Sequence, residues 1–181
     1  AVGMPNYSHY PIVDRRGLIM PFWDSWSIDA WVITDDGDLL VPSRLQENVK
    51  QQLNLNNEHS VVTESKTENL YLKNKAEVDR IDDNCICCIY LHAESSSPGW
   101  LVVSLRPYNP EGVSFIHHIQ YIKENNLWQI DEKHNVHLGE SPEKHVLSDY
   151  ANADVSLNLQ SENIEDRDLK CDVGMATAAA L

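Results

Sequence analysis

The stretch Trp26–Pro42, "WSIDAWVITDDGDLLVP", decides the fold class of this chain. Apolar and polar residues alternate at its start, and a period of two is typical of a β-strand with one buried face. Asp36 and Gly37 then favour a tight turn, because glycine adopts the positive φ that short hairpin turns require. A second apolar run follows at once. The stretch therefore predicts an antiparallel β-hairpin.

Similar short strand patterns, separated by polar turns, continue along most of the chain. The predicted strands cover residues 60–68, 69–80, 84–94, 100–107, 113–123, 127–131, 135–139, 144–149 and 153–160. Many short strands with frequent turns are typical of an all-β protein. We predict a single domain over residues 1–181, folded as a two-layer antiparallel β-sandwich with one short helix.

The predicted helix lies in the segment 43–55. Its apolar residues Leu45, Val49 and Leu53 recur every four positions, and Ser43 is placed to cap the first turn. This spacing gives one apolar face on an otherwise polar surface helix.

Two other segments depart from the strand pattern. Residues 161–170 are polar and charged, which predicts an exposed loop. The last residues, 173–181, form the apolar run "VGMATAAAL", whereas chain termini are commonly polar. We therefore expect the chain to have been cut from a longer protein.

The four cysteines indicate reduced thiols. Cys85, Cys87 and Cys88 lie in the apolar run 84–94, which predicts a central strand covered on both faces, and the fourth is Cys171. Neighbouring residues of a strand point to opposite faces, so this spacing favours buried free thiols over a disulfide framework. We expect a cytoplasmic protein.

Charge and hydropathy exclude several classes of partner. The chain has 14 Lys and Arg against 28 Asp and Glu, a formal net charge of −14, which repels nucleic acid and anionic membranes. No apolar run approaches the roughly 18 residues that a membrane span needs. We expect neither nucleic acid nor membrane as a partner.

No catalytic residue, cofactor site or metal site is predicted. The common signatures of nucleotide binding, serine hydrolysis and zinc proteolysis are missing from the sequence. The adjacent residues His117 and His118 would face opposite sides of a strand, as would His134 and His137. The histidines are therefore predicted to be ordinary surface or half-buried residues.

Aromatic residues gather in and before the predicted hairpin, where the sequence holds Phe22, Trp23, Trp26 and Trp31. Two interpretations are open. Exposed Trp rings stack on sugar rings, and nearby carboxylates accept hydrogen bonds from sugar hydroxyls. Alternatively, the rings anchor the core beneath the hairpin, since each buries a large apolar area.

The segment 104–115, "SLRPYNPEGVSF", predicts a rigid connection between two strands. Its prolines fix φ and hold the residues before them extended, and Gly112 permits a positive φ. A strand should end at Leu105, the next should open at Phe115, and the segment between them should stay out of any sheet ladder. The polar side chains of this loop are candidate contacts with a ligand or a neighbouring domain: Arg106, Tyr108, Asn109 and Glu111. An ion pair between Arg106 and Glu111 is the structural alternative.

Several blocks of this sequence resemble a known family. They are "WDSWSIDAWVITDDGDLLVPSR", "VVTES", "LVVSLRPYNPEGVSFIHHI", "HVLSDYANADVSL" and "VGMATAAAL", which together reach from Trp23 to Leu181. These blocks are similar to the amino-terminal β-sandwich, or supersandwich, of bacterial glycogen-debranching and glucoamylase-like glycosidases. In that family the sandwich precedes an (α/α)6 barrel that carries the catalytic acids. The resemblance implies a non-catalytic domain of a carbohydrate-active protein, with a downstream barrel as its partner.

Two further functions stay open. The chain could be an independent carbohydrate-binding module for α-glucans that uses Trp23, Trp26 and the loop 106–111. It could also be a small hydrolase with paired carboxylates, which rests only on the abundance of acidic residues.

Overall fold

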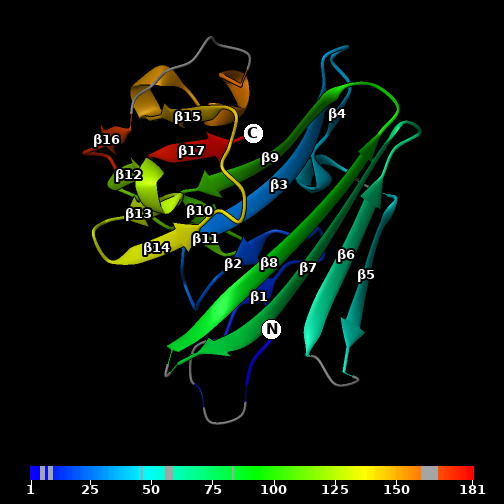
Figure 1. Ribbon diagram of the computed structural model, residues 1–181, viewed down its shortest axis with the longest axis horizontal. Helices are drawn as coiled ribbons and strands as arrows, with labels where there is room; N and C mark the ends of the chain where they lie inside the picture. The colour runs from blue at the N-terminus through cyan, green and yellow to red at the C-terminus, as the bar shows by residue number, and fades with distance from the viewer. Residues whose placement is uncertain (5–6, 8–9, 46, 56–58, 83, 160–166) are drawn as a thin grey trace.

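The computed structural model describes residues 1–4, 7, 10–45, 47–55, 59–82, 84–159 and 167–181, and the statements below concern these residues. It confirms an all-β fold made of antiparallel sheets in two layers (Figure 1). The helical segments described are short 3-10 turns: η1 Pro42–Arg44, η2 Lys123–Asn125, η3 Tyr150–Asn152 and η4 Val155–Leu157.

One layer is a single sheet with the strand order β1-β2-β3-β9-β17-β15, and β4 also pairs with β3. Its strands are β1 Ile12–Val13, β2 Ile19–Met20, β3 Ser27–Thr34, β4 Leu39–Leu40, β9 Gly99–Arg106, β15 His145–Ser148 and β17 Thr177–Ala180. The predicted hairpin is confirmed as β3 and β4. Val32 pairs with Leu40, and Gly37 adopts a φ of +91° in the turn between them.

The other layer consists of two four-stranded sheets, ordered β5-β6-β7-β8 and β14-β13-β12-β16. Their strands are β5 Val49–Asn54, β6 Ser60–Lys66, β7 Leu70–Ile81, β8 Asn84–Ser95, β12 His118–Ile122, β13 Leu127–Ile130, β14 His134–His137 and β16 Asp168–Lys170. In Figure 1, β5 to β8 are the cyan and green strands beside the long strands β3 and β9.

Both sheets of this second layer pack against the same face of the first. Alternate residues of β3 supply that face: Ile28 joins the cluster around Trp128, and Ala30 and Val32 join the cluster around Leu72. The opposite face of the first sheet is covered by the segment that contains η4. The two faces of β3 are therefore both buried, which explains its long apolar run.

The helix predicted over 43–55 is wrong in its extent. The structure has a single 3-10 turn, η1, followed by strand β5, which pairs with β6 along its whole length. Ser43 does not cap the turn, and the side chain of Leu53 is 58% exposed. The ladder with β6 satisfies the backbone of this segment, so a tertiary contact overrides a local four-residue spacing.

Strand β8 is not the central strand that its apolar run predicted. It lies at the edge of its sheet, and Cys85, Cys87 and Cys88 are half-buried rather than enclosed in the core. All four cysteines are free thiols, as predicted, and Cys171 is buried. Burial raises the pKa of the Cys87 thiol to about 12, so this thiol stays protonated at neutral pH.

Two further predictions need correction. Residues 153–160 were expected to form a strand, but the described part contains the 3-10 turn η4. Most of the loop predicted over 161–170 lies outside the described residues, and its end forms the edge strand β16, paired with β12. Among the described residues, no helix is long and apolar enough to cross a membrane.

Candidate functional site

The loop 107–115 is a small hairpin of its own. Strand β10 (Tyr108–Asn109) pairs with β11 (Gly112–Val113), and neither joins the larger sheets, as predicted. Gly112 adopts a φ of +148°. The expected boundaries shift, because β9 continues to Arg106 and the next strand, β12, begins only at His118. The last residue of β9 therefore belongs to the sheet and not to the loop.

Asn109 fixes this hairpin to the rest of the molecule. Its side chain is buried, and its Nδ2 donates to the carbonyl oxygen of Ser25 at 2.9 Å. Its Oδ1 accepts from the backbone N–H groups of Glu111 at 2.8 Å and Gly112 at 3.1 Å. One amide side chain thus closes the turn and ties it to the segment before β3.

Replacing Asn109 should destabilise the protein more than the loss of one small side chain implies. We expect Asn109→Ala to lower the free energy of unfolding by about 2 kcal/mol, because it leaves the buried carbonyl of Ser25 and two partly buried N–H groups without their partner. Asn109→Asp keeps the acceptor for the two N–H groups but turns a carboxylate oxygen toward the Ser25 carbonyl oxygen, so at neutral pH it should cost at least as much as Asn109→Ala. At about pH 3 the protonated carboxyl group can donate to that carbonyl, and Asn109→Asp should then cost about half as much as Asn109→Ala. Urea denaturation measures both. Equal effects of the two variants at about pH 3 would show that the acceptor contacts contribute nothing.

Arg106 is an internal residue and does not face solvent. It is 6% exposed and forms an ion pair with Asp154, not with Glu111 as the alternative had it. Its guanidinium lies 5.1 Å from the ring centre of Trp31 and 5.2 Å from that of Tyr108. This geometry suits a structural cation between two aromatic rings.

The partner carboxylate is held in its charged form. Burial acts to raise the pKa of Asp154, but the hydrogen bonds from Ser156 and the charge of Arg106 outweigh it and leave the pKa below its ordinary value. Asp154 also begins η4, where its Oδ1 accepts from the backbone N–H of Ser156 at 2.8 Å. The ion pair therefore fastens the segment with η4 to strand β9.

The aromatic group divides into core and surface. Trp26 and Trp31 are 5% and 2% exposed, so the core interpretation describes them. Phe22 stacks on His134 with the ring centres 4.6 Å apart. Trp23, in contrast, is 61% exposed and is free to contact a partner. Of the predicted contact residues, Trp23 and Glu111 are exposed and Tyr108 is half-buried.

Exposed apolar side chains gather around the small hairpin; they are Trp23, Val113, Phe115 and Val173, and we call them the loop surface. Three segments meet here. Ser114 Oγ donates to the carbonyl oxygen of Asp24 at 3.2 Å, and the backbone N–H of Ile116 donates to the carbonyl oxygen of Gly174 at 2.8 Å. The loop surface is therefore built from ordered backbone, although its members are distant in sequence.

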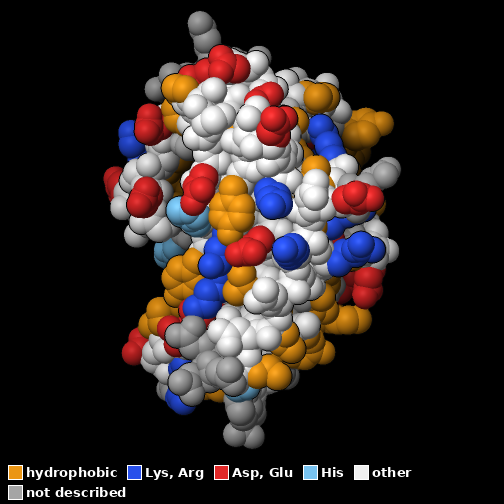
Figure 2. All heavy atoms as spheres, turned by 90° about the vertical axis from the view of Figure 1, so that its right-hand side faces the viewer, with side chains coloured by type: hydrophobic (Ala, Val, Ile, Leu, Met, Phe, Trp, Pro, Cys, Tyr) orange, Lys and Arg blue, Asp and Glu red, His pale blue; other side chains and the backbone are white. Residues whose placement is uncertain are grey.

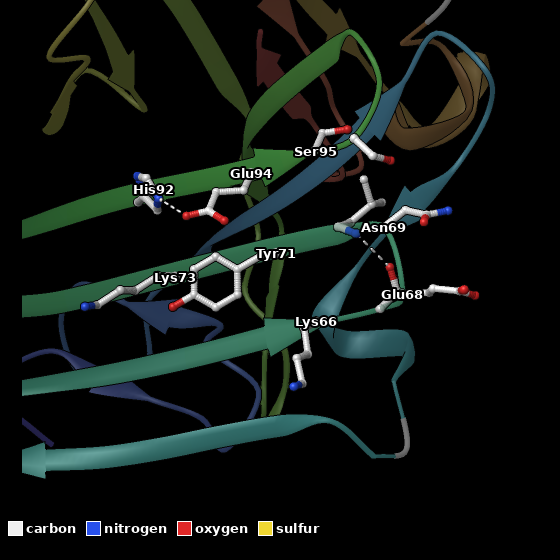
Figure 3. Close-up of a pocket in the computed structure, with 11 residues that line it drawn as sticks. Lys66, Glu68, Asn69, Tyr71, Lys73, His92, Glu94 and Ser95 are labelled. Atoms are coloured by element: carbon white, nitrogen blue, oxygen red, sulfur yellow. Dashed lines mark hydrogen bonds and ion pairs between the residues drawn. The ribbon is translucent and has the colours of Figure 1, made fainter.

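A second candidate lies on the outward face of the sheet β5–β8 and was missed by the sequence analysis. It is an open hollow of about 620 Å³, which we call the sheet hollow (Figure 3). Its lining residues include Lys66, Glu68, Asn69, Tyr71, Lys73, His92, Glu94 and Ser95. Figure 2 views this side of the molecule and shows Lys and Arg side chains interspersed with Asp, Glu and hydrophobic ones.

Tyr71 occupies the centre of the sheet hollow. Its hydroxyl donates to Glu64 Oε1 at 2.8 Å, and its ring stands edge-on to His92 with the centres 6.2 Å apart. His92 Nε2 lies 3.0 Å from Glu94 Oε1. The sequence signal was present in "NLYLKNK", whose alternation puts Tyr71 and Lys73 on one face, but it cannot tell which face stays outside.

His117 and His118, at the start of strand β12, contact different neighbours. His118 lies between Glu132 Oε1 and Asp168 Oδ1, at 2.8 Å from each. Burial acts to lower the His118 pKa, yet the two carboxylates outweigh it and raise the pKa above its ordinary value. His117 turns away, toward the carbonyl oxygen of Cys171. Within the described residues, no group of three or more His, Cys, Asp or Glu side chains is placed to hold a metal ion.

Comparison with known proteins adds no relative: no family model, no curated protein and no solved structure matches this chain. The resemblance to glycogen-debranching and glucoamylase-like glycosidases therefore stays a prediction.

Proposed function

We propose that this chain is a non-catalytic β-sandwich domain of a carbohydrate-active, glycogen-debranching or glucoamylase-like protein. In this proposal the loop surface docks on a downstream (α/α)6 barrel of the same polypeptide. The observation that supports it best is the loop surface itself, where apolar side chains stay exposed on a hairpin held rigid from below. Clustered exposed apolar groups mark interaction surfaces, and a rigid surface loses little entropy on binding.

The buried polar residues of the loop favour docking over chemistry. Arg106 and Asn109 are buried, and their side chains bind Asp154 and the carbonyl oxygen of Ser25 within the molecule, so they shape the hairpin and do not face a substrate. Of the two Trp residues proposed to contact a sugar here, Trp26 is buried in the core and Trp23 is 61% exposed. The alternative of a carbohydrate-binding module at the loop thus rests on Trp23.

Hydrogen exchange of backbone amides tests the docking role. The exchange of residues 1–181 alone is compared with that of the complete polypeptide encoded by the same reading frame. We expect the amides of 111–115 and 172–174 to exchange about tenfold more slowly in the complete polypeptide, because the docked barrel excludes water. The turn 67–69, at the sheet hollow, serves as the internal control and should not change.

Two results would contradict this role. One is a reading frame that encodes no further helical domain. The other is equal exchange at the loop surface in both proteins, since a docked barrel cannot leave these amides unprotected.

A further inference from the structure

We infer that the sheet hollow is a binding site for a short oligosaccharide that carries carboxylate groups, such as a uronic acid oligomer. The inference concerns a different surface from the loop surface and does not depend on the proposed docking role. It rests on three properties of the hollow: unpaired lysines, a fixed aromatic ring and a closed polar end (Figure 3).

The first property is a pair of lysines without ion-pair partners on an acidic protein. Acidic residues outnumber basic ones two to one, 28 against 14, yet among the described residues neither Lys66 nor Lys73 has an ion-pair partner. Glu64 lies directly opposite Lys73 in the ladder between β6 and β7, but its carboxylate accepts the hydroxyl of Tyr71 instead. Two ammonium groups are thus left available for an acidic ligand.

The second property is the half-buried ring of Tyr71. Its hydroxyl is tied to Glu64 and its position is supported by the ring of His92, so the ring is held in one orientation. Figure 3 shows it among Lys66, Lys73 and His92. An aromatic face held in place is a platform for the apolar face of a pyranose ring, at a small cost in side-chain entropy.

The third property is a polar end that limits the length of the ligand. The turn between β6 and β7 and the turn between β8 and β9 are joined there, because the backbone N–H of Ser96 donates to the carbonyl oxygen of Asn69 at 3.2 Å. Asn69, Ser95 and Glu94 supply groups that pair with sugar hydroxyls. The volume of about 620 Å³ lies within the usual range for small-ligand sites and suits a ligand of about three sugar units.

The acidic residues near the hollow favour this ligand over polyanions with closely spaced charges. Glu68 and Glu94 line the same space, and the whole chain carries a net charge of −14. Carboxylates accept hydrogen bonds from sugar hydroxyls, whereas they repel closely spaced phosphates. The site therefore fits a sugar chain with widely spaced charges better than a nucleic acid.

Calorimetric titration of the full chain with trigalacturonic acid tests this inference. We expect a dissociation constant of about 1 mM at low ionic strength, weakening several-fold as salt is added. Maltotriose, which has the same length and no carboxylates, should bind about tenfold more weakly. The absence of binding of trigalacturonic acid at about 10 mM, or equal affinity for the two sugars, would overturn the inference.

Variants locate the binding. The double variant Lys66→Gln/Lys73→Gln should weaken the binding of trigalacturonic acid about tenfold, and Tyr71→Leu should weaken the binding of both sugars. The matched control Lys123→Gln/Lys133→Gln removes the same charge at exposed positions elsewhere and should bind normally. The unfolding midpoint of each variant confirms its fold.

Two outcomes of these variants would overturn the inference. In one, the double variant in the hollow binds as the control does. In the other, a single-stranded DNA oligonucleotide binds more tightly than trigalacturonic acid with the same dependence on Lys66 and Lys73, which would make the hollow a general polyanion site.

Discussion

Arg106→Met should lower the free energy of unfolding by about 3 kcal/mol. The substitution removes the ion pair with Asp154 and the contacts of the guanidinium with Trp31 and Tyr108. Removing one member of a buried pair costs about 3 to 5 kcal/mol, and the lower figure applies because the Asp154 side chain stays 34% exposed and can be hydrated. Urea denaturation at neutral pH measures the change.

A matched control and a double-mutant cycle make this prediction specific. Arg44→Met removes the same side chain at an exposed position and should change the free energy of unfolding by less than about 0.5 kcal/mol. Asp154→Asn keeps the acceptor for the N–H of Ser156 while removing the charge. Additive effects of Arg106→Met and Asp154→Asn would contradict the ion pair, because coupled residues give non-additive changes.

The second large effect is a pair of opposing contributions to the pH dependence of stability. Asp29 is 3% exposed, and its carboxylate accepts from the Trp31 indole N–H at 2.7 Å and from the backbone N–H of Ala30 at 2.9 Å. Burial nevertheless dominates and raises the pKa of Asp29 to about 6. His145 is stacked on Tyr121 and accepts from the Trp128 indole N–H at 2.6 Å, and burial lowers the pKa of His145 to about 4.

The two groups act in opposite directions as pH rises. The unfolded chain ionises Asp29 near its ordinary pKa, whereas the folded protein holds the proton until about pH 6. The contribution of Asp29 to stability is therefore present at low pH and falls by about 3 kcal/mol as the pH rises between these values. His145 behaves oppositely, because its folded pKa is lowered to about 4, and its contribution falls by about 3 kcal/mol as the pH drops from the ordinary histidine pKa.

Single variants separate the two contributions. As the pH rises from about 4 to about 6, the free energy of unfolding of Asp29→Asn should increase by about 3 kcal/mol relative to that of the unmodified chain. Over the same rise in pH, the free energy of unfolding of His145→Gln should decrease relative to that of the unmodified chain. Urea denaturation across this range gives both difference curves. Asp172→Asn and His137→Gln, at exposed positions, are the controls. Flat difference curves for Asp29→Asn and His145→Gln would contradict the two shifted pKa values.

Local signals predicted the strands well. The hairpin β3–β4, the strands β6 to β9 and the hairpin β12–β13 were all visible in the alternation of apolar and polar residues and in the turns between them. These signals work because side-chain direction in a strand and the φ of glycine and proline are properties of the local backbone. The predictions were wrong where a local pattern was ambiguous, as in the segment predicted to be a helix that forms strand β5.

The candidate sites were less predictable than the fold. The rigid hairpin around Asn109 followed from its prolines and glycine, but the sequence placed the side chains of Arg106 and Asn109 outside when they lie inside. The sheet hollow was missed because exposed lysines and tyrosines on a strand are ordinary surface residues until their neighbours are known.

The sequence by itself determined that this protein is built from antiparallel strands and where most of its turns lie, because these depend on neighbours along the chain. The tertiary structure alone decided what the polar residues do. Arg106 meets Asp154 across a separation of 48 residues. Among the described residues Lys73 has no ion-pair partner, while the carboxylate of Glu64, which lies opposite it, accepts the hydroxyl of Tyr71. Such pairings depend on which segments lie side by side after folding, and no local pattern encodes that choice.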